Sequence, residues 1–353
     1  MSNTETVSLA SLSPKSTFNT GFSLAASLYL SKQTLYLRGE LGTGKTTFVQ
    51  GLGLGLGISE PIVSPTYALE NRYGGTLLHM DLFRIDPQEA RTLLEASEDF
   101  PGVRVVEWSE RVDEDYGLGT RDKGLAIGAK NETPSPKSLV LSPMITVTFT
   151  DISPTSRTIT VIFADLPLPD FGSIEEWRNE VKTPEHIRKH CDAVGTFAEH
   201  CAEALLRRGT IARPQALKIA GCLHDLLRFI DFLNTEDRKK HPEWIALAEQ
   251  YPCTHEEACA RFVTERGYPG LGMIISPHGL RTMDHPKDLK TIEQKLLFYA
   301  DKRVMGDRVV SLEERFKDFI ERYGNGVESE EAKRWRRKTE ELERELFGGD
   351  VPS

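Results

Sequence analysis

Paired cysteines and long apolar runs are both missing from this 353-residue sequence. The five cysteines form no C-x-x-C pair and lie within apolar helical patterns, which is typical of buried free thiols in a reducing cytosol, so no disulfide is expected. No window is long enough to span a bilayer. The apolar stretch FSLAASLYL has no basic segment before it and no cleavage-like sequence after it, so we expect no signal peptide and a cytoplasmic protein without membrane contact.

An excess of positive charge is also missing. The 44 basic residues are outnumbered by 53 acidic residues, which gives a formal net charge of −9. This balance argues against a generally basic, nucleic-acid-coating surface, and no direct DNA binding is expected. A net negative charge still permits a local basic patch. A chain of this length with 39% hydrophobic residues can bury more than one core, and its size suggests two domains.

Strand and helix patterns alternate in the first half of the chain. A helix is expected at 17–30, followed by strands in QTLYLRG, TLLHMDLF (76–83) and VRVVEW (103–108), which is the order of a parallel α/β sheet. MITVTFT (144–150) and RTITVIFA (157–164) predict a hairpin. Residues 113–138 are rich in Gly, Pro, Ser and charge and predict an inserted loop.

The composition changes at DLPLPDFGS (165–173), where Pro and Gly indicate a linker, and helical periodicity dominates from there on. The last helix, ESEEAKRWRRKTEELERELF, is highly charged and is expected to be solvated or lightly docked. The predicted organisation is an α/β domain at 1–165, a linker at 166–178, an all-helical domain at 179–323 and a charged C-terminal helix at 324–353.

The stretch GLGLGLGI (51–58) alternates apolar residues with glycine, which taken alone suggests a strand. Because it directly follows a phosphate-binding motif, where a helix begins, we expect a helix. Each interior glycine weakens such a helix by roughly 1 kcal/mol relative to alanine.

The phosphate-binding motif is GELGTGKT, which matches G-x-x-x-x-G-K-[ST] directly after a strand. Its glycines, Gly39 and Gly44, let backbone N–H groups curl around phosphates, Lys45 reaches the β/γ oxygens and the Thr46 hydroxyl ligates Mg²⁺. The alternative, a chance match in a glycine-rich turn, has little weight because the strand before and the helix after are both present.

Two acidic residues end neighbouring predicted strands. Asp81 in LLHMDLF is placed to hold the magnesium–water complex that a nucleotide site needs, and Glu107 in VVEW is a second carboxylate of this kind. The alternatives are a turn-forming Asp and an exposed edge charge.

Four motifs together resemble one family. LRGELGTGKTTFVQGL, VSPTYALENRY, LLHMDLFRI and VVEWSER occur in the order of the TsaE (YjeE) family, bacterial ATPases needed to make threonylcarbamoyladenosine in tRNA, and the resemblance covers about residues 8–165. It implies that Asp81 and Glu107 serve Mg²⁺, that Thr66 senses the γ-phosphate and that Trp108 packs near the base. On the residues alone, Thr66 is equally a turn residue and Trp108 equally a core residue.

The resemblance also implies a cofactor, a wider binding set and partners. The cofactor is ATP with Mg²⁺, and the partners are the tRNA threonylcarbamoyl-transferase and its paralogue. The nucleotide-binding set is Gly39, Glu40, Gly42, Thr43, Gly44, Lys45, Thr46, Thr47, Thr66 and Trp108, with Lys45, Asp81 and Glu107 as catalytic residues. The glycine-rich 51–58 and the insert at 113–138 depart from the family pattern.

An ionisable pair, His224 and Asp225, lies in the apolar run AGCLHDLLRF. Burying such groups costs several kcal/mol unless a partner or a metal satisfies them. His190 falls on the inward stripe of a helix predicted with an N-cap at Thr183, and Asp301 shares a helix face with apolar residues. For any single histidine a satisfied core position is the commoner alternative, but several inward polar groups indicate a shared metal such as Mn, Fe, Ni or Zn.

These four residues match the H…HD…D pattern of the HD superfamily of metal-dependent phosphohydrolases, a resemblance that covers about residues 179–323. His255 and His278 fall between the HD pair and the last Asp, as in members that hold two metals, so the resemblance implies one or two divalent ions and a catalytic Asp225. The implied ligand set is His190, His224, Asp225, His255, His278 and Asp301. Basic residues near these positions, expected to hold substrate phosphate unless they are surface charges, are Arg228, Lys302 and Arg303.

The sequence therefore predicts a bifunctional enzyme: a P-loop ATPase domain with a central, mostly parallel sheet, followed by an all-α HD-type domain that hydrolyses a nucleotide-type substrate. Two alternatives stay open. The P-loop half is a nucleotide-sensing module that regulates the HD half, or the HD half is a metal-stabilised scaffold without catalysis.

Overall fold

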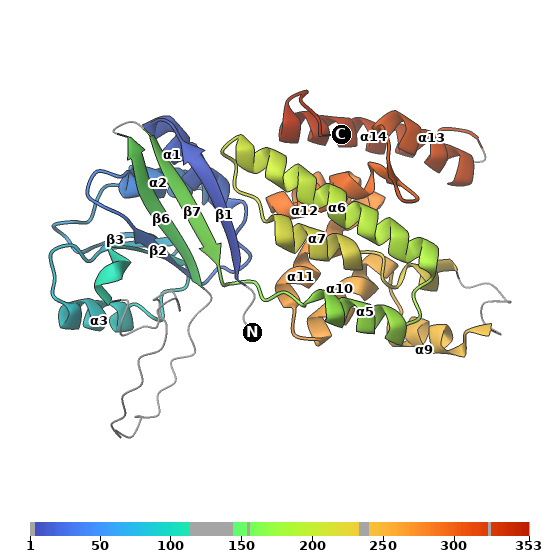
Figure 1. Ribbon diagram of the computed structural model, residues 1–353, viewed down its shortest axis with the longest axis horizontal. Coiled ribbons are helices and arrows are strands. Elements are labelled where there is room, and N and C mark those ends of the chain that lie inside the picture. Colours follow the sequence, from blue (N-terminus) through green and yellow to red (C-terminus); the bar gives the residue numbers. More distant parts are fainter. Residues whose placement is uncertain (1–3, 113–143, 154–155, 233–239, 324–325, 353) are drawn as a thin grey trace, which may run out of the picture.

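The computed structural model describes residues 4–112, 144–153, 156–232, 240–323 and 326–352, and the predicted insert at 113–138 lies outside them. An α/β half and a helical half lie side by side (Figure 1). Within the described residues, no helix has both the length and the apolar character needed to cross a membrane.

A seven-stranded sheet with the order β1-β7-β6-β2-β5-β4-β3 forms the centre of the α/β half. Strands β6, β2, β5 and β4 are parallel, whereas β1, β7 and β3 pair antiparallel at the two sides. The expected strands and hairpin are confirmed, but β1 and β3 were not predicted. The strands are β1 (Glu5–Ser11), β2 (Gln33–Arg38), β3 (Glu70–Tyr73), β4 (Leu77–Asp81), β5 (Val103–Glu107), β6 (Met144–Ser153) and β7 (Ser156–Phe163).

Helices cover both faces of this sheet. Successive side chains of β2 point to opposite faces. Leu35 and Leu37 share a core with α1 (Pro14–Ala25) and α2 (Lys45–Gly55) on one face, whereas Tyr36 shares a core with α3 (Pro87–Ala96) on the other. The helix expected at 17–30 begins earlier, because Ser13 forms a capping box ahead of Pro14, and it ends at Ala25.

The glycine-rich stretch after the phosphate motif is helical, as expected, as far as Gly55, and Gly51 within it is a packing position. A Cβ on Gly51 would lie 1.9 Å from the Phe18 carbonyl oxygen of α1, and a Cβ on Gly21 of α1 would lie 2.0 Å from the Phe48 carbonyl oxygen of α2. The two helix backbones therefore approach so closely that only glycine fits.

The second half is built from helices around one large core, with a small two-stranded sheet, β8 (Val304–Met305) and β9 (Arg308–Val309), that the sequence did not predict. Short 3-10 turns include η1 (Ser109–Val112) in the α/β half and η2 (Arg228–Phe232) and η3 (Ser276–His278) here. The α-helices are α5 (Phe171–Glu180), α6 (Glu185–Arg207), α7 (Pro214–Leu223), α9 (Pro242–Gln250), α10 (His255–Glu265), α11 (Pro269–Ile275), α12 (Ile292–Asp301), α13 (Leu312–Tyr323) and α14 (Glu330–Phe347).

The structure adds detail to two expectations for this half and corrects a third. Within the segment predicted as a linker, 166–178, Leu166 and Leu168 are buried and α5 begins at Phe171. The N-cap of α6 is Pro184 and not the predicted Thr183, whose hydroxyl donates to the Leu226 carbonyl instead. The last helix, α14, docks through Leu342, Leu346 and Phe347, which are buried in the core of this half.

A buried polar network joins the two halves. Arg213, at the start of α7, donates to both carboxylate oxygens of Asp165 at 2.9 Å and to the Ser27 carbonyl at 2.6 Å. Glu293, in the first turn of α12, accepts from the hydroxyls of Ser27 at 2.6 Å and Tyr29 at 2.7 Å. The N-terminal ends of α7 and α12 are therefore fixed against the α/β half.

Candidate functional site

The phosphate loop connects β2 to α2 at the carboxyl edge of the parallel strands. Gly39, Gly42 and Gly44 adopt φ values of 141°, 86° and 94°, which side chains other than glycine rarely accept. Gly44 is the N-cap of α2, so the first N–H groups of the helix lie at the loop. This geometry is that of an anion site at a helix N-terminus.

Lys45 lies folded over this loop. Its ammonium group donates to the carbonyl oxygens of Gly39 at 2.7 Å and Glu40 at 3.0 Å, and it lies 4.0 Å from the centre of the Trp108 ring. Burial lowers the pKa of Lys45, against the opposing influence of Glu107. Trp108 also packs on Phe83, with ring centres 4.7 Å apart. Its ring therefore contacts both Phe83 and Lys45.

The strand-end acids lie together next to the loop, because Asp81 and Glu107 are register partners of adjacent parallel strands. The Thr46 hydroxyl donates to Glu107 Oε1 at 3.1 Å, and the Thr66 hydroxyl donates to Asp81 Oδ2 at 2.6 Å. The structure thus brings the proposed magnesium residues and Thr66 together as two hydrogen-bonded pairs at the ends of adjacent strands. Thr43 is buried and Thr47 half-buried in the same loop–helix segment.

Two residues of this region were missed by the sequence analysis. His79, expected to be structural only, is fully buried, and its Nε2 lies 2.9 Å from Glu107 Oε1. Glu110 lies near Lys45 and Gly39, and burial raises the pKa of its carboxyl group. The i, i+2 alternation of β4 offered a signal for His79, because it places His79 on the same face as Asp81.

A second group of ionisable side chains gathers in the helical half. His224 and Asp225 follow the end of α7, His190 lies on α6 and Asp301 ends α12. A Cβ on Gly221 would lie 2.3 Å from the Gly195 Cα, so α6 and α7 pack closely, and the rings of His190 and His224 lie 5.4 Å apart. Residues of α6, of the end of α7 and of α12 that are 34 to 111 positions apart in the sequence therefore converge, as the metal hypothesis requires.

The four histidines turn their Nε2 atoms toward the carboxylates of Asp225 and Asp301. The Nδ1 atoms of His190, His224 and His278 lie 2.9, 2.7 and 2.8 Å from the carbonyl oxygens of Gly306, Gly221 and Ile275. His255 Nδ1 lies 2.6 Å from Asp231. Such partners fix the ring orientation and leave the opposite nitrogen free to bind a metal.

Asp225 lies between two sets of these nitrogens. Its Oδ1 is 3.0 Å from His255 Nε2 and 3.3 Å from His278 Nε2, whereas its Oδ2 is 3.8 Å from His224 Nε2 and 4.0 Å from His190 Nε2. Asp301 Oδ1 faces the second set, at 3.1 Å from His190 and 3.6 Å from His224. The arrangement offers two cation positions that share one carboxylate.

One atom of this cluster fits a metal particularly well. His224 Nε2 is buried and has no hydrogen-bond partner in the part of the chain that the structure describes. A buried unpaired nitrogen costs free energy, and a bound cation removes that cost. Burial opposes the charge on Asp225, but His224 and His255 hold its pKa well below the usual range.

The neighbouring basic residues differ in their surroundings. Lys302 is buried, pairs with Asp301 and donates to the His278 carbonyl at 3.1 Å. Arg303 donates to the Val310 carbonyl and to the Tyr299 hydroxyl instead. These contacts do not support the phosphate-binding role expected for it. Arg228 lies beside His255 and Asp231, with 29% of its side chain exposed.

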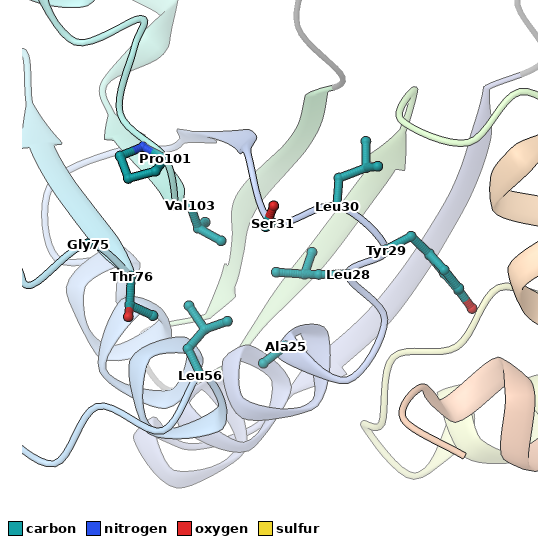
Figure 2. Close-up of a pocket in the computed structure, with 11 residues that line it drawn as sticks. Ala25, Leu28, Tyr29, Leu30, Ser31, Leu56, Gly75, Thr76, Pro101 and Val103 are labelled. Carbon is teal, nitrogen blue, oxygen red and sulfur yellow. The ribbon is translucent and has the colours of Figure 1, made fainter. Parts of the chain in front are cut away.

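A cavity of about 380 Å³ lies at the opposite edge of the sheet, among Ala25, Leu28, Leu56, Thr76 and Val103 (Figure 2). Figure 2 shows the Tyr29 side chain turned away from it, toward the helical half. The lining is largely apolar and lies far from both clusters, so this cavity is not the candidate site.

Comparison with known proteins bears on the first of the two clusters. The family model described as "Threonylcarbamoyl adenosine biosynthesis protein TsaE" aligns with one part of the chain. Residues 11–135 match the TsaE family. The match supports a TsaE-family domain here, which contains the phosphate loop, Asp81 and Glu107.

Curated TsaE relatives agree with this match. The chain is similar to the "tRNA threonylcarbamoyladenosine biosynthesis protein TsaE" of Nostoc sp., at 47% identity over 28% of this chain and 65% of the relative, and of Bacillus subtilis, at 35% identity over 26% and 60%. The chain thus spans about three fifths of the length of these TsaE proteins. A solved structure, "Crystal structure of Bacillus subtilus YdiB", aligns at 23% identity over 46% of this chain and 88% of that chain, with a TM-score of 0.32.

Proposed function

We propose that the α/β half binds and hydrolyses ATP with Mg²⁺ and thereby supports threonylcarbamoyladenosine modification of tRNA, together with the threonylcarbamoyl-transferase and its paralogue. The observation that supports this most is the position of two hydrogen-bonded pairs, Thr46 with Glu107 and Thr66 with Asp81, beside the phosphate loop. The names of the TsaE relatives supply the pathway.

Each part of this site has a distinct task. The glycines and the start of α2 present N–H groups to the phosphates, and Lys45 exchanges its contacts with Gly39 and Glu40 for phosphate oxygens. Thr46, Asp81 and Glu107 hold Mg²⁺ directly or through water. When bound, Mg²⁺ neutralises developing charge on the phosphates. Thr66 connects the segment 64–66 to Asp81, so that segment responds to the occupancy of the site.

We propose further that the helical half is an HD-type, metal-dependent phosphohydrolase that acts on a nucleotide-type substrate. The observation that supports this most is the convergence of four imidazoles and two carboxylates around the unpaired His224 Nε2. His190, His224 and Asp301 would hold one ion of the Mn, Fe, Ni or Zn class, His255 and His278 would hold a second, and Asp225 would serve as a ligand between the two sets. A metal bound there lowers the pKa of a bound water and polarises phosphoryl oxygens. Arg228 orients the substrate phosphate from the mouth of the site.

The two activities are separated by variants of the full-length protein. Phosphate release is measured from ATP, other nucleotides and dinucleotide polyphosphates, with metal content measured in parallel. Lys45→Ala should lose ATP hydrolysis and keep its transition metal, whereas Asp225→Ala should lose the metal-dependent release and keep ATP binding. If Asp225→Ala left all phosphate release intact, the helical half would be a metal-stabilised scaffold.

The role in tRNA modification needs a test in cells. In cells that lack their own ATPase for this step, the chain should restore threonylcarbamoyladenosine, and Lys45→Ala should not. Failure of the unaltered chain to restore it would contradict this part of the proposal.

A regulatory relation between the halves is the second candidate. It is favoured by one observation: α7 and α12 begin in the buried network against the α/β half, and α7 ends two residues before Asp225 whereas α12 ends at Asp301. In that case the P-loop half senses nucleotide and sets the activity of the helical half. Phosphohydrolase activity that changes with a non-hydrolysable ATP analogue in the unaltered protein, but not in Lys45→Ala, would support it.

A further inference from the structure

Glu256 was absent from the ligand set predicted from the sequence, yet its carboxylate lies beside the second cation position. It follows His255 in the first turn of α10, and its side chain is 22% exposed, on the more open side of the cluster. Glu256 Oε2 lies 3.3 Å from His255 Nδ1, and one carboxylate oxygen of Glu256 and one nitrogen each of His255 and His278 lie within 4.8 Å of one another. Three donors at this spacing can reach a common ion.

A glycine makes room for this carboxylate. A Cβ on Gly279 would lie only 2.3 Å from Glu256 Oε1. Gly279 adopts φ −69° and ψ 151°, a conformation that any residue accepts, so the backbone itself does not require glycine there. The absence of a side chain at Gly279 therefore leaves the space that the Glu256 carboxylate occupies next to His278.

The two cation positions differ in the number of carboxylates that they have without Glu256. Without it, the second position has two imidazoles and one oxygen of Asp225, a carboxylate that it shares with the first position. The first position has Asp301 as a carboxylate of its own. Glu256 supplies the second position with the corresponding negative charge, and its oxygen suits a hard divalent ion such as Mn²⁺.

Resting on the HD-type function proposed above, we propose that Glu256 is a ligand of the second metal ion, together with His255, His278 and Asp225. A carboxylate in the first turn of a helix is also stabilised by the helix N-terminus. Glu257 shares that location on α10 but is exposed, and it therefore serves as the matched control.

The test is a titration of metal-free, full-length protein with Mn²⁺ alone, by calorimetry, with bound metal per chain counted after gel filtration. The unaltered protein should bind two ions. Glu256→Gln should keep the first and bind the second at least about tenfold more weakly. Glu257→Gln should match the unaltered protein. Gly279→Ala, which displaces the carboxylate while retaining it, should weaken the second ion in the same way.

The outcomes separate this inference from the function on which it rests. Two ions bound with unchanged affinity in Glu256→Gln would overturn the role of Glu256 and leave the metal-dependent function standing. One ion in the unaltered protein would overturn the second position alone. No ion in the unaltered protein would overturn both. A circular dichroism spectrum of each variant equal to that of the unaltered protein shows that a loss of Mn²⁺ is local.

Discussion

Arg213 and Asp165 form a two-bonded ion pair in which neither side chain has any exposed surface. Arg213 caps the helix that leads to His224 and Asp225, and Asp165 follows β7 of the α/β half. Gln33, at the start of the strand that leads to the phosphate loop, donates to the same Asp165 at 2.7 Å. The Arg213–Asp165 pair thus contacts both the helix that leads to His224 and Asp225 and the strand that leads to the phosphate loop.

Removing one partner of this pair should destabilise the whole chain. Asp165→Asn leaves a buried guanidinium without its counter-charge, and such changes cost about 3–5 kcal/mol. Chemical denaturation should show a lower free energy of unfolding. Asp350→Asn, which breaks the exposed pair with Arg208, should cost less than about 1 kcal/mol. Equal effects of the two changes would contradict the structural role of the buried pair.

The glycines of α2 should tolerate no side chain where α1 crosses. Gly51→Ala places a methyl group against the Phe18 carbonyl and should cost about 1–3 kcal/mol through overpacking, despite the better helix propensity of alanine. Because α2 starts at the phosphate loop, ATP affinity should fall as well. Leu54→Ala, on the exposed side of the same helix, is the control and should change neither quantity appreciably. Stabilisation by Gly51→Ala would show that the helices do not pack as closely as described.

His79 should act on Mg²⁺ through Glu107. His79→Leu removes the hydrogen bond at 2.9 Å that orients the carboxylate, and the Mg²⁺ affinity of the ATP complex should fall by about tenfold or more. His79→Gln retains a donor and should recover part of the loss, while the exposed His200→Gln should have no effect. The measurement is ATPase rate and nucleotide binding as a function of Mg²⁺ concentration. A loss of stability without a change in Mg²⁺ dependence would make His79 a packing residue only.

Glu5 should make stability depend on pH. Its carboxylate accepts from the backbone N–H of Gln215 at the start of α7, and burial raises its pKa from 4.5 to about 7. Because the folded state holds this proton more tightly, its contribution is complete below about pH 4.5 and is lost as the pH rises through 7. The loss amounts to about 3 kcal/mol.

Glu5→Gln removes this titration, so the difference in unfolding free energy between the variant and the unaltered protein should change across that pH window. Glu176→Gln changes an exposed residue and should leave the pH dependence as it is. A pH-independent difference between Glu5→Gln and the unaltered protein would rule out the raised pKa.

The sequence predicted those features that short patterns encode. A strand, a glycine turn and a helix start follow one another within GELGTGKTT, so the phosphate loop was located to the residue. The H…HD…D spacing on apolar helix faces likewise placed His190, Asp225 and Asp301 in one group, and their atoms do converge.

Features that depend on distant partners escaped prediction. Strand β1 has a weak pattern and exists because it pairs with β7, about 150 residues later. Glu293 looked like an ordinary residue in the first turn of a helix, because its partners Ser27 and Tyr29 lie in the other half. Glu256 escaped because only the neighbouring Gly279 reveals where its carboxylate lies.

We propose that the helical half binds a cation through His190, His224, Asp225 and Asp301. The most direct measurement is anomalous X-ray scattering from a crystal of the Mn²⁺-loaded protein, compared with Asp225→Asn treated in the same way. We predict an anomalous peak among these four side chains in the unaltered protein and its loss in the variant. An Mn²⁺-loaded crystal without a peak at this position would contradict the account.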